Sequence, residues 1–109
     1  MKLTYPTTLV LHALSRRYHY GFDIMDATAL PSGTVYPILR RLDREGLVRS
    51  RWEDEAEARR EQRPSRRYYE LTAAGERTVA DALNRYRALQ DIVPRTLPRV
   101  RPARRGITS

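Results

Sequence analysis

The sequence predicts an α+β fold in which three helices come first, a two-stranded hairpin follows and a last helix comes after it. Apolar residues recur at helical spacing as far as Gly46, alternate with polar residues beyond it, and return to helical spacing after Thr72. A chain of 109 residues is most simply one domain with a modest core. We therefore expect a small domain that mixes both kinds of secondary structure.

The first helix is expected to begin near Pro6, because proline costs nothing in a first turn whose amides lack helical partners. Thr4 lies just upstream of that start. The apolar residues that follow form a stripe that we expect to be buried: Leu9, Val10, Ala13 and Leu14. The polar segment RRYHYG predicts a turn, and YGFDIMDA predicts a short second helix with Phe22, Ile24 and Met25 pointing inward.

The third helix is expected to start at Ser32 as its cap and to end at Gly46, since glycine suits a left-handed C-cap. Four apolar residues at i, i+3, i+4 and i+7 mark its buried side: Val35, Ile38, Leu39 and Leu42. The opposite side is basic, and its side chains near the start of the helix are small. It carries Gly33, Pro37, Arg40 and Arg44, with Tyr36 and Arg41 on its flanks.

The hairpin is predicted from two stretches in which side chains alternate, LVRSRWE and RRYYELT. In the first stretch Val48, Ser50 and Trp52 share one side. In the second stretch Arg67, Tyr69 and Leu71 share one side. A charged loop from Asp54 to Ser65 joins the strands, so we expect an antiparallel hairpin with an extended arm.

The last helix is expected to be capped by Thr72 and to carry an apolar seam spaced like that of a coiled coil. The seam residues are Val79, Ala82, Tyr86, Leu89 and Val93. Two heptads are marginal alone, so this helix needs either its own domain or another subunit as a partner. Tyr86 and Leu89 could also line a ligand pocket, although a plain seam is the simpler interpretation. Beyond it, three prolines and five arginines in residues 94–109 predict an unfolded basic tail.

This order of elements is the winged helix-turn-helix arrangement, in which the third helix enters the DNA major groove and the hairpin reaches the flanking backbone or minor groove. The hydroxyls of Ser32, Thr34 and Tyr36 and the small Gly33 favour a close approach to phosphates at the start of the helix. We expect Arg40, Arg41 and Arg44 to contact DNA. The alternative is a solvated basic face with Asp43 and Glu45 as its partners.

Three arginines of the hairpin are further candidates for DNA contacts: Arg63, Arg66 and Arg67. The alternative is an ion-paired loop, because the segment EDEAEARREQR carries five acids. The same acids could suggest a metal site, but the segment has no glycine turn to converge oxygens, and a solvated loop is the favoured interpretation. Trp52 and the tyrosines are expected to pack the hairpin rather than to stack on bases.

Several blocks in this sequence resemble the PadR family of bacterial transcriptional regulators. These blocks are GTVYPILRRLDREGLV, the downstream Trp52 and RYYELTAAG. The segment YGFDIM is also similar to the family's histidine-glycine-tyrosine stretch. The resemblance as a whole covers about residues 5–90. The match includes Ser32, Gly33, Thr34, Tyr36, Pro37 and Arg40. The resemblance implies a homodimeric winged helix-turn-helix repressor that is often relieved by a small-molecule effector.

The charge distribution and the residue types narrow the classes of function. The formal net charge is +8, but residues 1–50 account for +3, residues 51–93 are balanced, and residues 94–109 contribute +5. The chain has no cysteine, no apolar run long enough to span a membrane, and no nucleophile, acid–base pair or phosphate loop. We thus expect a cytoplasmic, non-enzymatic protein without a metal or other cofactor.

The predicted organisation is a DNA-binding domain over residues 1–72, a dimerisation helix over 73–93 and a disordered basic tail over 94–109. Its predicted function is sequence-specific binding of double-stranded DNA as a homodimer. There are two alternatives. The protein could be a winged-helix module that binds other proteins, or a nonspecific nucleic-acid binder whose affinity comes from the basic tail.

Overall fold

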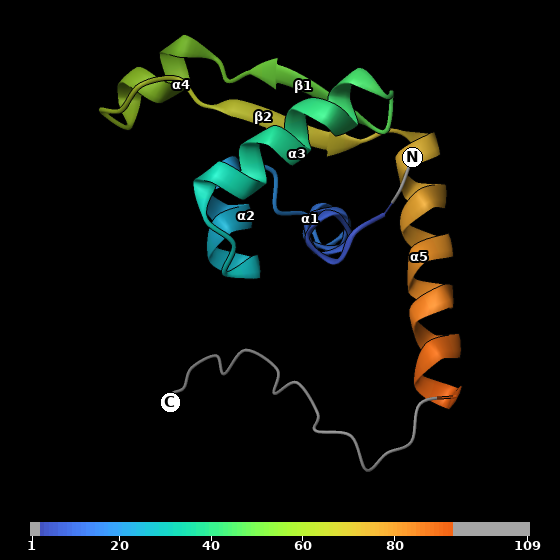
Figure 1. Ribbon diagram of the computed structural model, residues 1–109. Coiled ribbons are helices and arrows are strands. Elements are labelled where there is room, and N and C mark those ends of the chain that lie inside the picture. The colour runs from blue at the N-terminus through green and yellow to red at the C-terminus, as the bar shows by residue number, and fades with distance from the viewer. Residues whose placement is uncertain (1–2, 93–109) are drawn as a thin grey trace.

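The structure is a computed structural model that describes the backbone of residues 3–92 and the side chains of residues 3–88. The elements are α1 (Tyr5–Ser15), α2 (Gly21–Thr28), α3 (Ser32–Arg44), β1 (Val48–Trp52), α4 (Glu55–Arg60), β2 (Arg67–Leu71) and α5 (Ala73–Ile92). The predicted α+β winged helix-turn-helix fold is confirmed, with α4 as an addition. Figure 1 shows α3 lying across the hairpin, with α4 at one end of the strands and α5 beyond the other.

The N-terminal half of the domain is largely as the sequence predicts, except that Leu9 is half-buried and Leu11, which was not expected in the stripe, is fully buried. Thr4 caps α1 by accepting a hydrogen bond from the amide of Thr7. The core of the domain gathers side chains from α1, α2, α3, the sheet and α5. Its fully buried members are Val10, Leu11, Ile24, Val35, Leu39 and Leu42.

The expected inward position of Phe22 is wrong, because 72% of this residue is exposed. Helix α2 has only eight residues and packs through Gly21 and Ile24, which lie three positions apart on one side. A Cβ atom on Gly21 would overlap the ring of Tyr36 from α3, so the two helices meet at this glycine. Phe22 is one residue further along, which turns it away from that contact.

Helix α3 begins one residue earlier than expected, so Ser32 is its first residue and not its cap. Pro31 occupies the cap position in an extended conformation, and its carbonyl accepts the amides of Thr34 and Val35 at 2.9 and 3.0 Å. The buried side of α3 is confirmed. Gly46 takes a φ of +78°, the left-handed conformation expected for the end of this helix.

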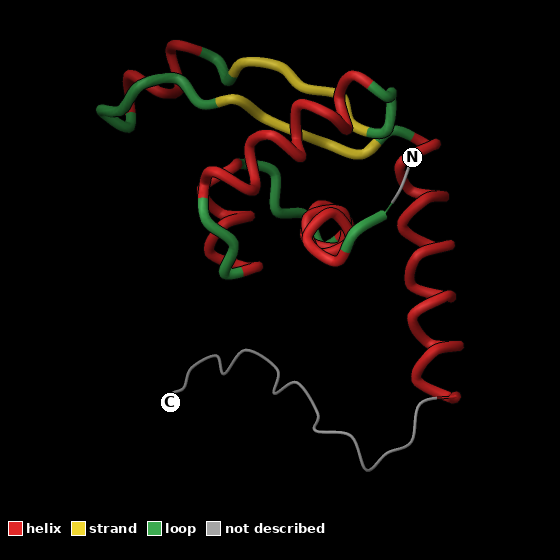
Figure 2. The backbone as a smooth tube through the Cα atoms, in the orientation of Figure 1, coloured by secondary structure: helices red, strands yellow, loops and turns green. Residues whose placement is uncertain are grey.

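The hairpin alternates as predicted, and its register assigns every side chain to a face. The pairs Val48↔Leu71, Ser50↔Tyr69 and Trp52↔Arg67 share the face toward α3, and Arg49↔Glu70 and Arg51↔Tyr68 occupy the other. The strands run side by side, as the yellow segments of Figure 2 show. A single bridge between Tyr20 and Tyr68 adds the turn before α2 to the edge of β2.

The segment expected to be a charged loop contains the short helix α4. Asp54 caps it by accepting the amide of Ala56 at 3.1 Å, and Ala58 is buried. Its acids lie in the first turn and its arginines in the last, which suits the helix dipole. The arm of the hairpin is therefore a folded element.

Helix α5 begins with Thr72 accepting the amide of Gly75 at 3.1 Å, as expected for a cap. Val79 and Ala82 are buried, and Val79 belongs to the core of the same chain. Tyr86 is 49% exposed. The first half of the expected seam thus covers its own domain. The side chain of Leu89, the whole of Val93 and the predicted tail lie outside the residues that the structure describes.

Candidate nucleic-acid interface

The outer edge of α3 is open to solvent along its length. Ser32, Gly33, Pro37, Arg40 and Arg44 are exposed, while Thr34 and Tyr36 are half-buried. No atom lies within 4 Å of the position a Cβ atom on Gly33 would take. Within residues 3–88, Arg40 and Arg44 take part in no ion pair, so both guanidinium groups are available. Asp43 and Glu45, their partners in the alternative interpretation, do not pair with them within this range.

Arg41 points toward the protein. Its Nη2 donates to the hydroxyl of Thr7 at 3.1 Å, and Thr7 in turn accepts from the hydroxyl of Thr4 at 3.0 Å. Thr7 is completely buried, so this chain of hydrogen bonds joins α3 to the start of α1. The three predicted arginines of α3 therefore have different roles. Arg40 and Arg44 face solvent, whereas Arg41 anchors the helix to α1.

Tyr36 also has a structural role. Its ring fills the space beside Gly21, where any side chain would collide with it. This contact lets α2 and α3 approach closely, and it sets the spacing of the helix-turn-helix. The Tyr36 hydroxyl oxygen is itself one of the atoms beside Gly21, although the residue as a whole is only half-buried.

Arg63 forms a two-pronged ion pair with Glu53 at the base of the arm. Its Nη1 donates a hydrogen bond to Oε1 of Glu53, and its Nη2 donates one to Oε2 at 2.7 Å. Only 8% of the Glu53 side chain is exposed. Hydrogen bonding to Arg63 lowers the pKa of Glu53 to about 2, against the opposing effect of burial. The ion-paired interpretation of this loop is therefore the one that the geometry supports for Arg63.

Arg66, which lies just before β2, and Arg67, the first residue of β2, point in opposite directions. Arg66 lies 3.8 Å from the ring centroid of Tyr20 and 3.5 Å from Glu53. Arg67 points to the α3 face, where its Nη2 donates to Ser50 at 2.9 Å and its guanidinium lies 5.0 Å from the Trp52 ring centroid. Of these three arginines, Arg67 alone is on the side of the sheet that α3 occupies.

We predict that the Glu53 ion pair makes the fold sensitive to acid. A carboxylate whose folded pKa is about 2 and whose ordinary pKa is 4.5 stabilises the fold fully above pH 4.5, and that stability is lost as the pH falls toward 2. Glu53→Gln should therefore lower the melting temperature at neutral pH and flatten its decline below pH 4.5. Melting curves recorded across this pH range test the prediction, and the exposed Glu57→Gln serves as the control. Equal pH profiles of melting temperature for wild type and Glu53→Gln would contradict the prediction.

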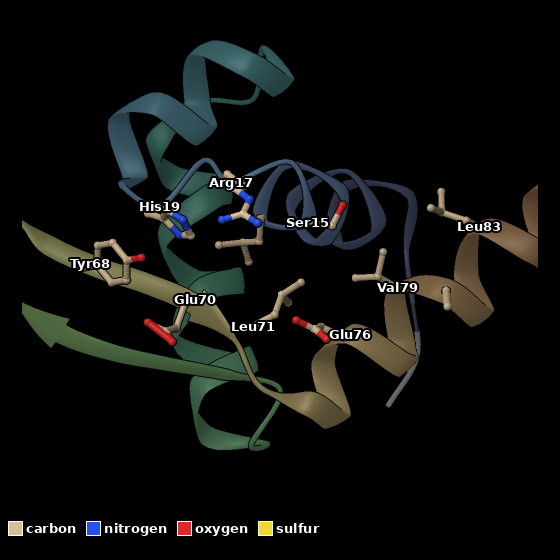
Figure 3. A pocket seen from close by; sticks show the side chains of 11 residues that line it. Ser15, Arg17, His19, Tyr68, Glu70, Leu71, Glu76, Val79 and Leu83 are labelled. Atoms are coloured by element: carbon tan, nitrogen blue, oxygen red, sulfur yellow. The ribbon is translucent and has the colours of Figure 1, made fainter.

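A cavity of about 520 Å³ lies between α1, β2 and α5. Figure 3 shows Arg17 and His19 reaching it from the turn after α1, and Glu70 and Glu76 from β2 and α5. Its apolar lining consists of Leu14, Leu71, Val79, Ala80 and Leu83. His19 itself is committed to the fold, since its Nδ1 bonds the Tyr69 carbonyl at 2.8 Å and its ring stacks on Tyr68. Sequence patterns did not predict this cavity, because it needs residues from three separate elements.

Nowhere between residues 3 and 88 do three His, Cys, Asp or Glu side chains converge as metal ligands would. None of the helices placed by the structure has the length and apolar character needed to cross a membrane.

An exposed basic helix edge, carried on a helix-turn-helix and flanked by a hairpin, is the arrangement of a DNA-binding transcriptional regulator. A family model described as the Transcriptional regulator PadR-like family matches residues 10–81, which is more than half of the chain. The chain belongs to this family. It is therefore a DNA-binding transcriptional regulator and not an enzyme.

Several solved structures are similar to this chain. A PadR family transcription regulator from Clostridium difficile is 23% identical, with a TM-score of 0.72 over 82% of this chain and 94% of that one. A PadR family transcriptional regulator from Eggerthella lenta is 30% identical, with a TM-score of 0.62 over 77% of this chain and 76% of that one. Bordetella bronchiseptica BpsR, whose DNA binding is regulated by 6-hydroxynicotinic acid, is 26% identical with a TM-score of 0.68, over 95% of this chain and 72% of that one. No curated protein sequence matches the chain.

Proposed function

We propose that the protein is a cytoplasmic, dimeric repressor that binds a short pseudo-palindromic operator. The observation that carries this proposal is the basic edge of α3, where Arg40 and Arg44 form no ion pair within residues 3–88. The other candidate arginines, such as Arg41, Arg63 and Arg67, are used in internal contacts. Two copies related by a twofold axis would place two such edges about 34 Å apart, one turn of DNA, or at a multiple of that distance. Repression then follows from occlusion of the promoter.

The contacts in this proposal divide between groove and backbone. Arg40 and Arg44 enter the major groove, and the hydroxyls of Ser32, Thr34 and Tyr36 bind phosphates at the start of the helix. Gly33 and Pro37 allow the backbone to approach because neither extends far from the helix. Arg67 supplies the contact from the hairpin, whereas Arg41, Arg63 and Arg66 hold the surface in shape.

Dimerisation through the second half of α5 is the remaining part of the proposal. Val79 and Ala82 are already covered by the same chain, so the interface begins at the exposed Tyr86 and continues toward Leu89 and Val93. Helix α5 has 20 residues, and those of its described side chains that are buried in the same chain lie in its first half. The proposal therefore assigns its second half to another copy.

Selection of bound fragments from a genomic library, followed by sequencing, tests the proposal as a whole. A dyad-symmetric motif is expected, and it should persist when residues 94–109 are deleted, because α3 and not the tail would discriminate bases. Enrichment that follows only the net charge of the tail would favour the nonspecific alternative. An absence of any enriched sequence would leave the protein-interaction alternative.

The cavity between α1, β2 and α5 is our proposed site for a small-molecule effector. Its apolar floor and its polar groups Arg17, Glu70 and Glu76 suit a small amphipathic molecule, and α5 forms one of its walls. An occupant could thus alter the position of α5 and the distance between the two DNA-binding surfaces. Ala80→Trp, which fills the cavity, should abolish the response of operator binding to any inducer found by screening.

A further inference from the structure

A chain of hydrogen bonds runs from the recognition helix α3 to the second strand of the hairpin. The Ser50 hydroxyl donates to Oδ2 of Asp43 at 2.8 Å and accepts from Nη2 of Arg67 at 2.9 Å. These three residues come from α3, β1 and β2. A hydroxyl has one donor and two acceptor sites, so Ser50 can satisfy a carboxylate and a guanidinium at once.

Both hydrogen bonds in this chain involve a charged group, which makes each stronger than a neutral one. Asp43 and Arg67 do not pair directly, since the ion pairs of the described chain do not include them. The connection between the helix and β2 at this point thus passes through Ser50. Removing the hydroxyl would separate the two charges.

Arg67 is held on a second side by Trp52. The indole lies across the strand register from Arg67, and the guanidinium carbon is 5.0 Å from the ring centroid. Trp52 is 62% exposed and is not part of the core. A planar guanidinium that stacks on one face and donates at one edge is restricted in orientation, while its other edge stays free.

The hydrogen-bonded chain lies next to the groups that face DNA in the proposed function. Asp43 precedes Arg44 directly and follows Arg40 by three residues on the same helix. Tyr69, which is Ser50's partner across the strands, is buried beside this cluster, and the charges of Arg67, Asp43 and Arg40 all act on its hydroxyl. The helix edge and the hairpin thus meet at this group of side chains, in addition to their contacts in the core.

We propose that Asp43, Ser50 and Arg67 form a positioning relay that fixes the recognition helix relative to the hairpin and thereby determines how sharply the protein discriminates DNA sequences. This inference rests on the proposed function. Base contacts demand placement to within ~0.5 Å, whereas attraction to phosphates is long-ranged and tolerates a looser surface. Loosening the relay therefore costs specific binding and spares nonspecific binding.

The test compares Ser50→Ala with Ser50→Thr in the full-length protein. Ser50→Ala should reduce the ratio of affinities for the selected operator and for random DNA by about tenfold, the size of one good base contact. Affinity for random DNA and its dependence on salt should stay at wild-type values. Ser50→Thr keeps the hydroxyl and should keep the ratio, while an unchanged ratio in Ser50→Ala overturns the proposal.

A second measurement is independent of any operator. Trp52 is the only tryptophan of the chain, so its fluorescence in the free protein reports on the neighbouring Arg67. Ser50→Ala should shift the emission and Ser50→Thr should not, and identical spectra of all three proteins would also overturn the relay. If the wild type has no preferred sequence, the proposed function fails, yet this spectrum still decides whether the relay exists.

Arg67→Lys provides a further variant that keeps the positive charge. Lysine lacks the planar fork that donates to Ser50 while it stacks on Trp52. It should lower the affinity ratio as Ser50→Ala does and shift the Trp52 emission. A wild-type ratio in Arg67→Lys would show that charge alone is sufficient and would contradict the relay.

Discussion

Replacing Arg40 by alanine is expected to remove base discrimination at one operator position in each half-site. A bidentate arginine contact to a base contributes about 1–3 kcal/mol of discrimination, so each half-site should lose about tenfold or more in specific affinity. The loss is expected because Arg40 is exposed and makes no ion pair within the described part of the chain. Binding titrations against operators varied at single positions would measure it.

Arg41→Ala is the matched control for this experiment. It removes the same side chain from the same helix, but Arg41 is engaged with Thr7 and should affect stability rather than base preference. If both variants relaxed the same operator position equally, the assignment of Arg40 to the groove would be wrong. A uniform weakening on all sequences by Arg40→Ala would instead make Arg40 a phosphate contact.

Introducing a charge at Tyr86 is expected to have the other large effect. Tyr86→Asp places a carboxylate in the interface proposed for the second half of α5, where burial without a partner is costly. The variant should sediment as a monomer at concentrations where the wild type is dimeric. Because two linked half-sites bind far more tightly than one, operator affinity should fall by about a hundredfold or more.

Asn84→Asp serves as the control because it adds the same charge at an exposed position of α5 away from the seam spacing. It should remain a dimer and bind the operator with nearly wild-type affinity. Dimeric Tyr86→Asp would refute the proposed interface. Monomeric Asn84→Asp would mean that any added charge on this helix prevents association.

Local patterns were sufficient to predict most of the fold. The buried side of α3, the left-handed Gly46 and the two faces of the hairpin all follow from spacing within a few residues, and the structure contains each of them. Helix α4 was missed because four of its six residues are charged and Ala58 is its only buried residue. Ser32 was misassigned because the extended Pro31 can hold the cap position without a side-chain hydrogen bond.

The site was harder to predict because its arginines look alike in sequence. Arg63 and Glu53 are ten residues apart, and they meet only because α4 and a left-handed residue at Gln62 turn the chain back. Arg41 reaches Thr7 across 34 positions of sequence. Which arginines remain free for a ligand is therefore decided by long-range contacts, which spacing along the chain does not reveal.

The contact between Gly21 and Tyr36 restricts how this protein can change over evolutionary time. Any side chain at position 21 would occupy the space that the Tyr36 ring fills, so a larger residue at one position requires a smaller one at the other. The two positions should therefore be exchanged together or not at all. A library that randomises position 36 alone would sample the angle between α2 and α3 as well as DNA contacts, and its survivors would report on both.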